Sequence, residues 1–198
     1  MDALTALLTR HSVAPAFLGD PAPDDLALER ILAAGVCAPD HGRLRAWRFI
    51  VVRGAARERL GEVFAEALRK RQPDAPEPAL EQERQRPLRA PLVVALAARI
   101  DPRHPKIPEI EQILSAGAAA QNVLLAAHAL GFGAKWLTGA AAYDDHVKAA
   151  LDLEPGDRLI GFLHIGTVAG EAPRVPHADP REHILEWRGA PPDKGDRI

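Results

Sequence analysis

Residues 131–140 read GFGAKWLTGA, and they follow the alanine-rich stretch SAGAAAQNVLLAAHAL at residues 115–130. The alanine-rich stretch predicts a long helix, because alanine has the highest helix propensity of all amino acids. The segment after it predicts a short strand, although it holds glycines and a tryptophan where valine and isoleucine are usual. Glycine on either side of Trp136 permits a close approach of the backbone to another chain or to a flat ligand.

The small side chains of the predicted helix at 115–130 let another helix approach it closely. Two interpretations fit this composition. The helix is either a central core helix or a helix that packs at a subunit or domain interface.

Apolar periodicity and turn residues predict the remaining elements. Helices are expected at residues 2–10, 24–35, 55–71, 109–130 and 143–151, and strands at 48–54, 91–100, 133–139 and 158–168. The run at 91–100, PLVVALAARI, does not alternate between apolar and polar residues, so this strand should be buried on both faces. Residues 72–90 are polar and rich in proline, which indicates a surface loop with a short helix. The order of elements is typical of a mixed α/β protein with few hairpins.

Length and composition fit one globular domain of 198 residues, which we assign to residues 1–188 with a tail at 189–198. The net charge of −2 argues against a general role on nucleic acid. A single cysteine, Cys37, excludes an intrachain disulfide framework and a thiolate metal cluster. The first residues lack the features of a signal peptide, and no apolar run is long enough to span a membrane. We therefore expect a soluble cytoplasmic protein.

The common catalytic motifs are missing from the sequence. It contains no P-loop, no G-x-G-x-x-G that opens a helix, no H-E-x-x-H and no G-x-S-x-G. The eight histidines show no metal-ligand spacing, and His128 and His164 lie in apolar segments, where we expect core histidines. Nothing favours a Ser-His-Asp hydrolase, and Cys37 is expected to be a small buried residue.

Three stretches are unusual for purely structural segments. Arg10-His11-Ser12 follows the first helix and offers a planar guanidinium and a hydroxyl to a phosphate, although a solvated helix end explains it too. Residues 38–41, APDH, form either a simple turn or part of a site before Trp47. The third stretch is GFGAKWLTGA itself.

In this order the stretches resemble the nitroreductase family of flavin enzymes, and most closely its small NAD(P)H nitroreductases. The resemblance extends through MDALTALLTRHS, ILAAGVCAPDHGRLRAWRFIVVRG, RAPLVVALAARI, KIPEIEQ, GFGAKWLTGA and IGFLHIGT. It implies an α+β fold with a central mixed sheet flanked by helices. It also implies a homodimer with the alanine-rich helix at its interface and FMN in two clefts, each lined by both chains.

The resemblance also implies roles for particular residues. Arg10, His11 and Ser12 would bind the phosphate and ribityl chain of FMN, and Cys37 and His41 would lie near the flavin or its phosphate. The backbone and side chains of Trp136, Leu137 and Thr138 would shape the pocket. Metal ligands are not expected.

The sequence departs from the family pattern at a few positions. These departures suggest additional candidates for residues that bind the FMN phosphate. His11 and Cys37 stand where basic residues are common, and Ala46 replaces the proline of a Gln-Pro-Trp motif. Arg43 or Arg45 would restore the missing charge, and Arg174 in the tail is a further candidate phosphate ligand.

The reaction implied is a ping-pong transfer, in which NADH or NADPH reduces FMN at N5 and a nitroaromatic or quinone-like acceptor then takes the electrons. The sequence does not choose between the two donors, because no Rossmann fingerprint is present. Two alternatives remain. One is a flavoprotein of the same fold with another reductive reaction, such as dehalogenation or flavin fragmentation, and the other is a flavin-binding homodimer without turnover.

Overall fold

Strand β3 (Leu92–Ala98) lies in the middle of the sheet in a computed structural model that describes residues 1–187 and 189. The predicted tail at 189–198 lies outside these residues except for Gly189. The other strands are β1 (Leu18–Gly19), β2 (Trp47–Arg53), β4 (Gly133–Leu137) and β5 (Arg158–Val168). The α-helices are α1 (Ala3–Thr9), α2 (Asp25–Gly35), α3 (Ala56–Arg71), α4 (Glu77–Gln85), α5 (Glu109–Ala129) and α6 (Asp145–Ala150). Short 3-10 helices are η1 (Pro15–Phe17), η2 (His41–Arg43), η3 (Arg86–Arg89), η4 (Ala140–Tyr143) and η5 (Pro180–Glu182).

The sheet has the order β2-β3-β5-β4, and β1 pairs with the last two residues of β5. Every pairing is antiparallel, so the prediction of a mixed sheet is wrong. Two helices, α3 and α4, connect β2 to β3. The end of β2 and the start of β3 lie side by side, since Arg53 pairs with Leu92. The single helix α5 gives β3 and β4 the same direction, but β5 lies between them and pairs with both.

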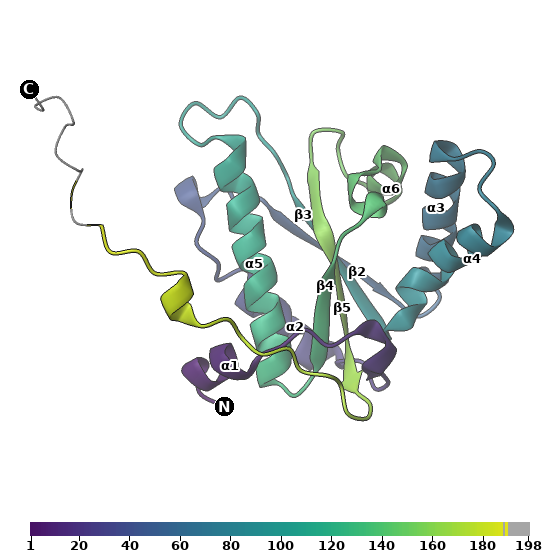
Figure 1. The fold of residues 1–198 in the computed structure, drawn as a ribbon. Helices are drawn as coiled ribbons and strands as arrows, with labels where there is room; N and C mark the ends of the chain where they lie inside the picture. Colours follow the sequence, from purple (N-terminus) through teal and green to yellow (C-terminus); the bar gives the residue numbers. More distant parts are fainter. Residues whose placement is uncertain (188, 190–198) are drawn as a thin grey trace, which may run out of the picture.

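Helices cover both faces of the sheet, with α2 and α5 on one face and α3 and α6 on the other (Figure 1). Successive residues of a strand point to opposite faces. Leu92, Val94 and Leu96 of β3 therefore pack under α2 and α5. Val93, Ala95 and Ala97 pack against α3 and α6, and the predicted burial of this strand on both faces is confirmed.

The glycines that follow α5 have structural roles within the chain. Gly131 has φ +89°, and the amides of Gly131 and Phe132 donate to the carbonyls of His128 (3.0 Å) and Ala127 (2.9 Å). This is the Schellman arrangement that ends a helix at a left-handed residue. A Cβ on Gly133 would lie 2.7 Å from side-chain atoms of both Leu18 and Val168, so its absence makes room for neighbours in the core.

Trp136 lies over a β-bulge in β5. The register between β3 and β5 shifts after Leu96, at Gly161, which has φ +150°. A Cβ on Gly161 would lie 2.4 Å from Nε1 of Trp136. The indole N–H donates to the carbonyl of Ile160 at 3.1 Å. The bulge and the absence of a side chain at Gly161 together allow the indole to pack directly on the sheet. Bulges often reorient a single side chain in this way.

Helix α5 buries one face and exposes another. Ala116, Ala119, Ala120 and Val123 are fully buried against the sheet, whereas Leu114 remains 62% exposed. The long alanine-rich helix is thus a core helix with an additional apolar, exposed side. No helix among the described residues is long and apolar enough to cross a membrane.

Candidate functional site

The start of β4 borders a basic cavity of about 620 Å³, which we call the Arg10 cavity. Arg10 and His11 reach it from the end of α1, and His128 reaches it from the end of α5. Arg174 comes from the segment after β5, which runs past the base of α5 and then leaves the body of the domain (Figure 1). Gly133 and Ala134 form the wall contributed by β4. The cavity thus gathers four basic side chains from three distant parts of the sequence, together with one carboxylate, that of Glu171.

The charges in the Arg10 cavity act on His128. Partial burial lowers the pKa of His128, and the positive charges of His11, Arg10 and Arg174 lower it further. Its Nε2 lies 2.9 Å from the hydroxyl of Thr9, and its ring makes an edge-to-face contact with His11 at 6.5 Å. Mutual repulsion among these cations is what a bound anion would relieve.

The other end of β4 borders a second cavity of about 390 Å³, which we call the His164 cavity. Phe64, Phe162 and Leu137 give it apolar walls, and Thr138 and Gly139 contribute the segment after the strand. Its polar side chains are Gln82, Arg86, Arg89 and His164. An apolar cavity with a few converging polar groups is typical of small-molecule sites.

His164 is the buried polar group of this cavity. It is 4% exposed, and its Nε2 donates to the carbonyl of Arg86 at 3.2 Å. Because a carbonyl only accepts, the neutral ring carries its proton on Nε2 and presents Nδ1 as an acceptor. Nδ1 has no hydrogen-bond partner among the described residues. The prediction that His164 is a core histidine is confirmed, whereas His128 is only partly buried and lines the Arg10 cavity.

Burial lowers the pKa of His164, and this predicts a pH effect on stability. The unfolded chain binds a proton below about pH 6.5 while the folded chain does not, so the free energy of unfolding should fall as the pH drops below that value. Urea unfolding at pH 7.5 and 5.5 should give a lower free energy of unfolding at pH 5.5 for the wild type. The decrease should be smaller for His164→Gln. The slopes of the free energy of unfolding against pH should differ between the two proteins by at most about 1.4 kcal/mol per pH unit, the limit for one proton. Parallel profiles would contradict the assignment, and the exposed His183→Gln serves as the control.

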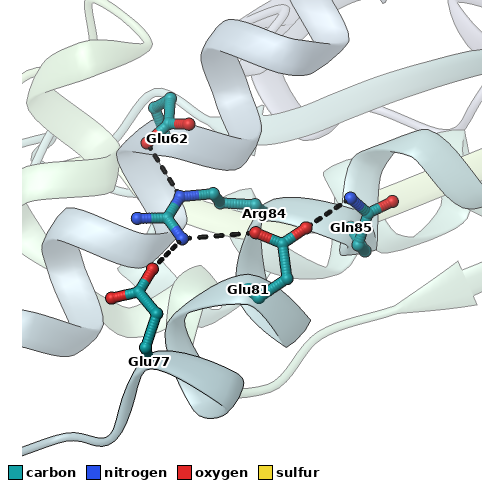
Figure 2. A network of polar contacts seen from close by, with 5 residues as sticks. All are labelled: Glu62, Glu77, Glu81, Arg84 and Gln85. Atoms are coloured by element: carbon teal, nitrogen blue, oxygen red, sulfur yellow. Dashed lines mark hydrogen bonds and ion pairs between the residues drawn. The ribbon is translucent and has the colours of Figure 1, made fainter.

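A network on α4 holds the polar wall of the His164 cavity in place. Arg84 donates to Glu62 of α3 at 3.1 Å and to Glu77 and Glu81 of its own helix at 2.6 and 3.3 Å (Figure 2). Bonds to Glu77 and Glu62 raise the pKa of Arg84 above its ordinary value. A Cβ on Gly61 would lie 2.3 Å from the carbonyl of Arg84, so the two helices are in direct backbone contact. The short helix predicted within the loop at 72–90 is confirmed as α4, which docks on α3.

The residues predicted from GFGAKWLTGA do not share one cavity. Adjacent strand residues face opposite sides of a sheet. Trp136 packs with the core under α5 and lines a third cavity, together with Leu114 and Tyr143. Leu137 and Thr138 line the His164 cavity on the other side.

The remaining predicted residues lie at separate positions. Ser12 is exposed directly after the two residues that line the Arg10 cavity. Cys37 is exposed at the end of α2, so the prediction of a buried cysteine is wrong; its Sγ donates to the carbonyl of Ala33 at 3.3 Å. His41 is exposed and pairs with Glu111 at the start of α5. Among the described residues, no three His, Cys, Asp or Glu side chains form a metal site.

Comparison with known proteins shows the family to which the chain belongs. A model of the nitroreductase family matches residues 7–167. The chain belongs to the nitroreductase family. It is 38% identical to the Escherichia coli protein named "Putative NAD(P)H nitroreductase YdjA" over 167 residues, which are 84% of this chain and 88% of that protein.

Two solved structures share this nitroreductase fold. A nitroreductase-like family protein from Bacillus cereus superposes with a TM-score of 0.78 at 23% identity, over 96% of this chain and 97% of the other. A Desulfovibrio desulfuricans protein described as a "putative nitroreductase in complex with fmn" has a TM-score of 0.71 at 26% identity, over 96% of this chain and 99% of the other. The α+β fold expected from the resemblance is confirmed.

The sequence-based prediction did not include Gln82, Arg86, Arg89 and His164, the polar residues that line the His164 cavity. Three of them lie in the segment at 72–90, where polarity and proline indicate a surface loop with a short helix and no ligand site. His164 was assigned to the core from its apolar neighbours. No local signal identifies any of the four, because they meet only when the end of α4 and η3 pack near His164 of β5.

Proposed function

We propose that this nitroreductase is an FMN-dependent NAD(P)H oxidoreductase that reduces nitroaromatic or quinone-like acceptors. The observation that supports this most is the pair of cavities at the two ends of β4. One is basic and the other is apolar with convergent polar groups. An elongated ligand with an anionic head and a flat, polar ring fits such a pair.

The Arg10 cavity fits the phosphate of FMN. A buried dianion requires cationic partners, and Arg10 and Arg174 offer guanidinium groups that have no side-chain partner among the described residues. His11 and His128 add imidazole nitrogens that would donate hydrogen bonds to the phosphate oxygens. Ser12, the next residue, extends this donor set toward the ribityl chain.

The edge of β4 leads from the Arg10 cavity toward the His164 cavity. Among the described strands β4 pairs only with β5, and the carbonyl of Ala134 on its free edge accepts from the amide of Val13 at 3.0 Å. Ala134 and Thr138 are about 13 Å apart at the usual rise of a strand. The free backbone groups between them suit hydrogen bonds to a ring that lies along the edge.

The His164 cavity is assigned to the polar end of the flavin ring. Arg86 and Arg89 would stabilise negative charge on the reduced ring, and His164 supports this wall by donating to the carbonyl of Arg86. When bound, FMN supplies the redox chemistry, taking two electrons from NAD(P)H and passing them to the acceptor. The chain's own residues bind the cofactor, orient it and shape the apolar walls, so no side-chain nucleophile is required.

We further propose that the protein is a homodimer that packs along α5, with Cys37 and His41 of one chain near the flavin of the other. Ile110 and Leu114 lie one turn apart on α5 and are 58% and 62% exposed, and the position of Gly117 opens to empty space. Exposed apolar side chains in such a group are typical of an interface. Trp136 lies at this surface and would line the cleft from the interface side.

Leu114→Glu is expected to convert the dimer to a monomer and to reduce FMN retention, because the charge would be buried against the partner. Light scattering after size exclusion should give twice the chain mass for the wild type and one chain mass for the variant. Val51→Glu, at an exposed apolar position on β2, is the control. A wild type that runs as a monomer would contradict the dimer.

The visible absorption spectrum of the purified protein tests the proposed function. A flavin spectrum, with about one FMN released per chain on denaturation, is the expected result. Oxidation of NADH or NADPH with a quinone acceptor should follow. A colourless protein that does not take up added FMN would contradict the proposal. A yellow protein that oxidises neither NADH nor NADPH would support flavin binding but not the oxidoreductase activity.

A further inference from the structure

A further basic cavity is separate from the two cavities assigned to FMN. It is a cavity of about 410 Å³ between the start of β2 and the loop that leaves β3, and we call it the Arg103 cavity. Its cationic side chains are Arg48, Arg99 and Arg103, and Asp101 is its one carboxylate. Leu44, Ile100 and Pro102 give it an apolar wall. Ligand sites in proteins have volumes of roughly 300–1,000 Å³.

The arginines of this cavity are available to a ligand. The side chains of Arg99 and Arg103 are exposed and make no hydrogen bond or ion pair with the described residues. Arg48 uses one nitrogen, Nη1, to donate to the carbonyls of Arg45 and Trp47 at 3.0 and 2.8 Å. Asp101 does not pair with any of them, and its Oδ1 accepts the amide of Arg103 at 3.1 Å. The cavity therefore keeps a net positive charge.

The backbone that carries Arg99 and Arg103 is held by hydrogen bonds to buried groups of the neighbouring elements. Gln112 of α5 is 2% exposed; its Oε1 accepts the amide of Asp101 and its Nε2 donates to the carbonyl of Asp101, both at 2.9 Å. The amide of Ile100 donates to Asp157 at 3.1 Å, and the amide of Arg99 donates to Ala46 at 2.7 Å. A rigid frame reduces the entropy that a ligand must overcome when it binds.

The opposite wall is a loop with unusual backbone geometry. Gly42, Arg43 and Arg45 all have positive φ, at +67°, +57° and +51°. Two arginines in the left-handed region are uncommon, and such residues cluster at functional sites. The carboxylate of Asp40 holds the loop by accepting the amide of Arg45 at 2.7 Å. This is the same loop whose His41 the proposed function places near a flavin.

We propose that the Arg103 cavity binds the phosphate groups of the nucleotide electron donor. Guanidinium groups bind phosphate through paired, charge-assisted hydrogen bonds. The apolar wall exceeds what a bare phosphate needs and suits an adenosine, on which an arginine also stacks. The inference rests on the proposed function for the identity of the ligand, and on the cavity alone for its phosphate chemistry.

Calorimetric titration of the holoprotein with 2′,5′-ADP, ADP and inorganic pyrophosphate tests this site without any turnover. The wild type should bind 2′,5′-ADP or ADP, with affinity that weakens as salt rises. The double variant Arg99→Ala/Arg103→Ala should bind at least tenfold more weakly. Arg59→Ala removes an exposed, unpaired arginine at the start of α3 and should bind like the wild type.

The other outcomes have separate meanings. Equal binding by the wild type and the double variant, or no binding of any probe, would overturn the site. Pyrophosphate binding as tight as that of both nucleotides would overturn the nucleotide assignment. The double variant should keep its flavin spectrum, so loss of nucleotide binding with FMN retained separates this inference from the proposed function.

Discussion

Replacing Arg10 with alanine should weaken FMN binding by about 10- to 100-fold, since a hydrogen bond to a charged group contributes roughly 1.5–3 kcal/mol. Arg10 lies in the Arg10 cavity with its guanidinium unpaired by any described residue. The variant should therefore fold normally and lose only its anion partner. Flavin fluorescence on titration of the apoprotein with FMN and with riboflavin gives both affinities. The loss should appear for FMN and be absent for riboflavin, which lacks the phosphate.

Two further variants make the Arg10 prediction specific. Arg10→Lys keeps the charge but loses the planar fork, and should recover part of the affinity. Arg59→Ala should bind FMN like the wild type. An equal loss for FMN and riboflavin in Arg10→Ala would show that Arg10 does not contact the phosphate.

Gly161→Ala should lower the free energy of unfolding by about 2–5 kcal/mol, from overpacking and from a backbone angle that side chains avoid. The new Cβ would lie 2.4 Å from Nε1 of Trp136 and 2.6 Å from the carbonyl of Leu137. The indole would have to leave its place on β5 and give up its hydrogen bond to Ile160. Urea unfolding at fixed protein concentration, followed by tryptophan fluorescence and by circular dichroism, measures both changes.

Gly156→Ala is the matched control for Gly161→Ala. Gly156 precedes the same strand, and a Cβ there would meet nothing within 4 Å. Its effect should stay within about 0.5 kcal/mol, as for most surface substitutions. Equal stability of the two variants would contradict the proposed role of Gly161 in seating Trp136.

The elements of the fold were largely predictable because their signals are local. The uninterrupted apolar run at 92–98 predicts a strand that is buried on both faces. Asp24 at the start of α2 accepts the amide of Ala27 at 2.8 Å, as an N-cap aspartate should. The alanine-rich stretch is one helix, α5, and Gly131 ends it.

What the sequence could not reveal depends on how distant segments meet. The sheet is antiparallel throughout because β5, the last strand in the chain, enters between β3 and β4. Gln82, Arg86 and His164 converge only through the docking of α4, which Arg84 and Gly61 hold against α3. Cys37 lies in an apolar sequence yet is exposed, because α2 ends at Gly35 and the turn that follows buries Ala38 instead.

The position of β5 also sets the order in which the protein can acquire its structure. This strand pairs with β1, β3 and β4, yet it begins only at Arg158. Until the ribosome has released that residue, β3 exposes the edge that later pairs with β5, and β4 has no partner among the described strands. Such edges associate readily with other chains. The nascent protein therefore depends on its last strand to close the sheet, and any truncation before residue 158 should yield an insoluble chain rather than a smaller domain.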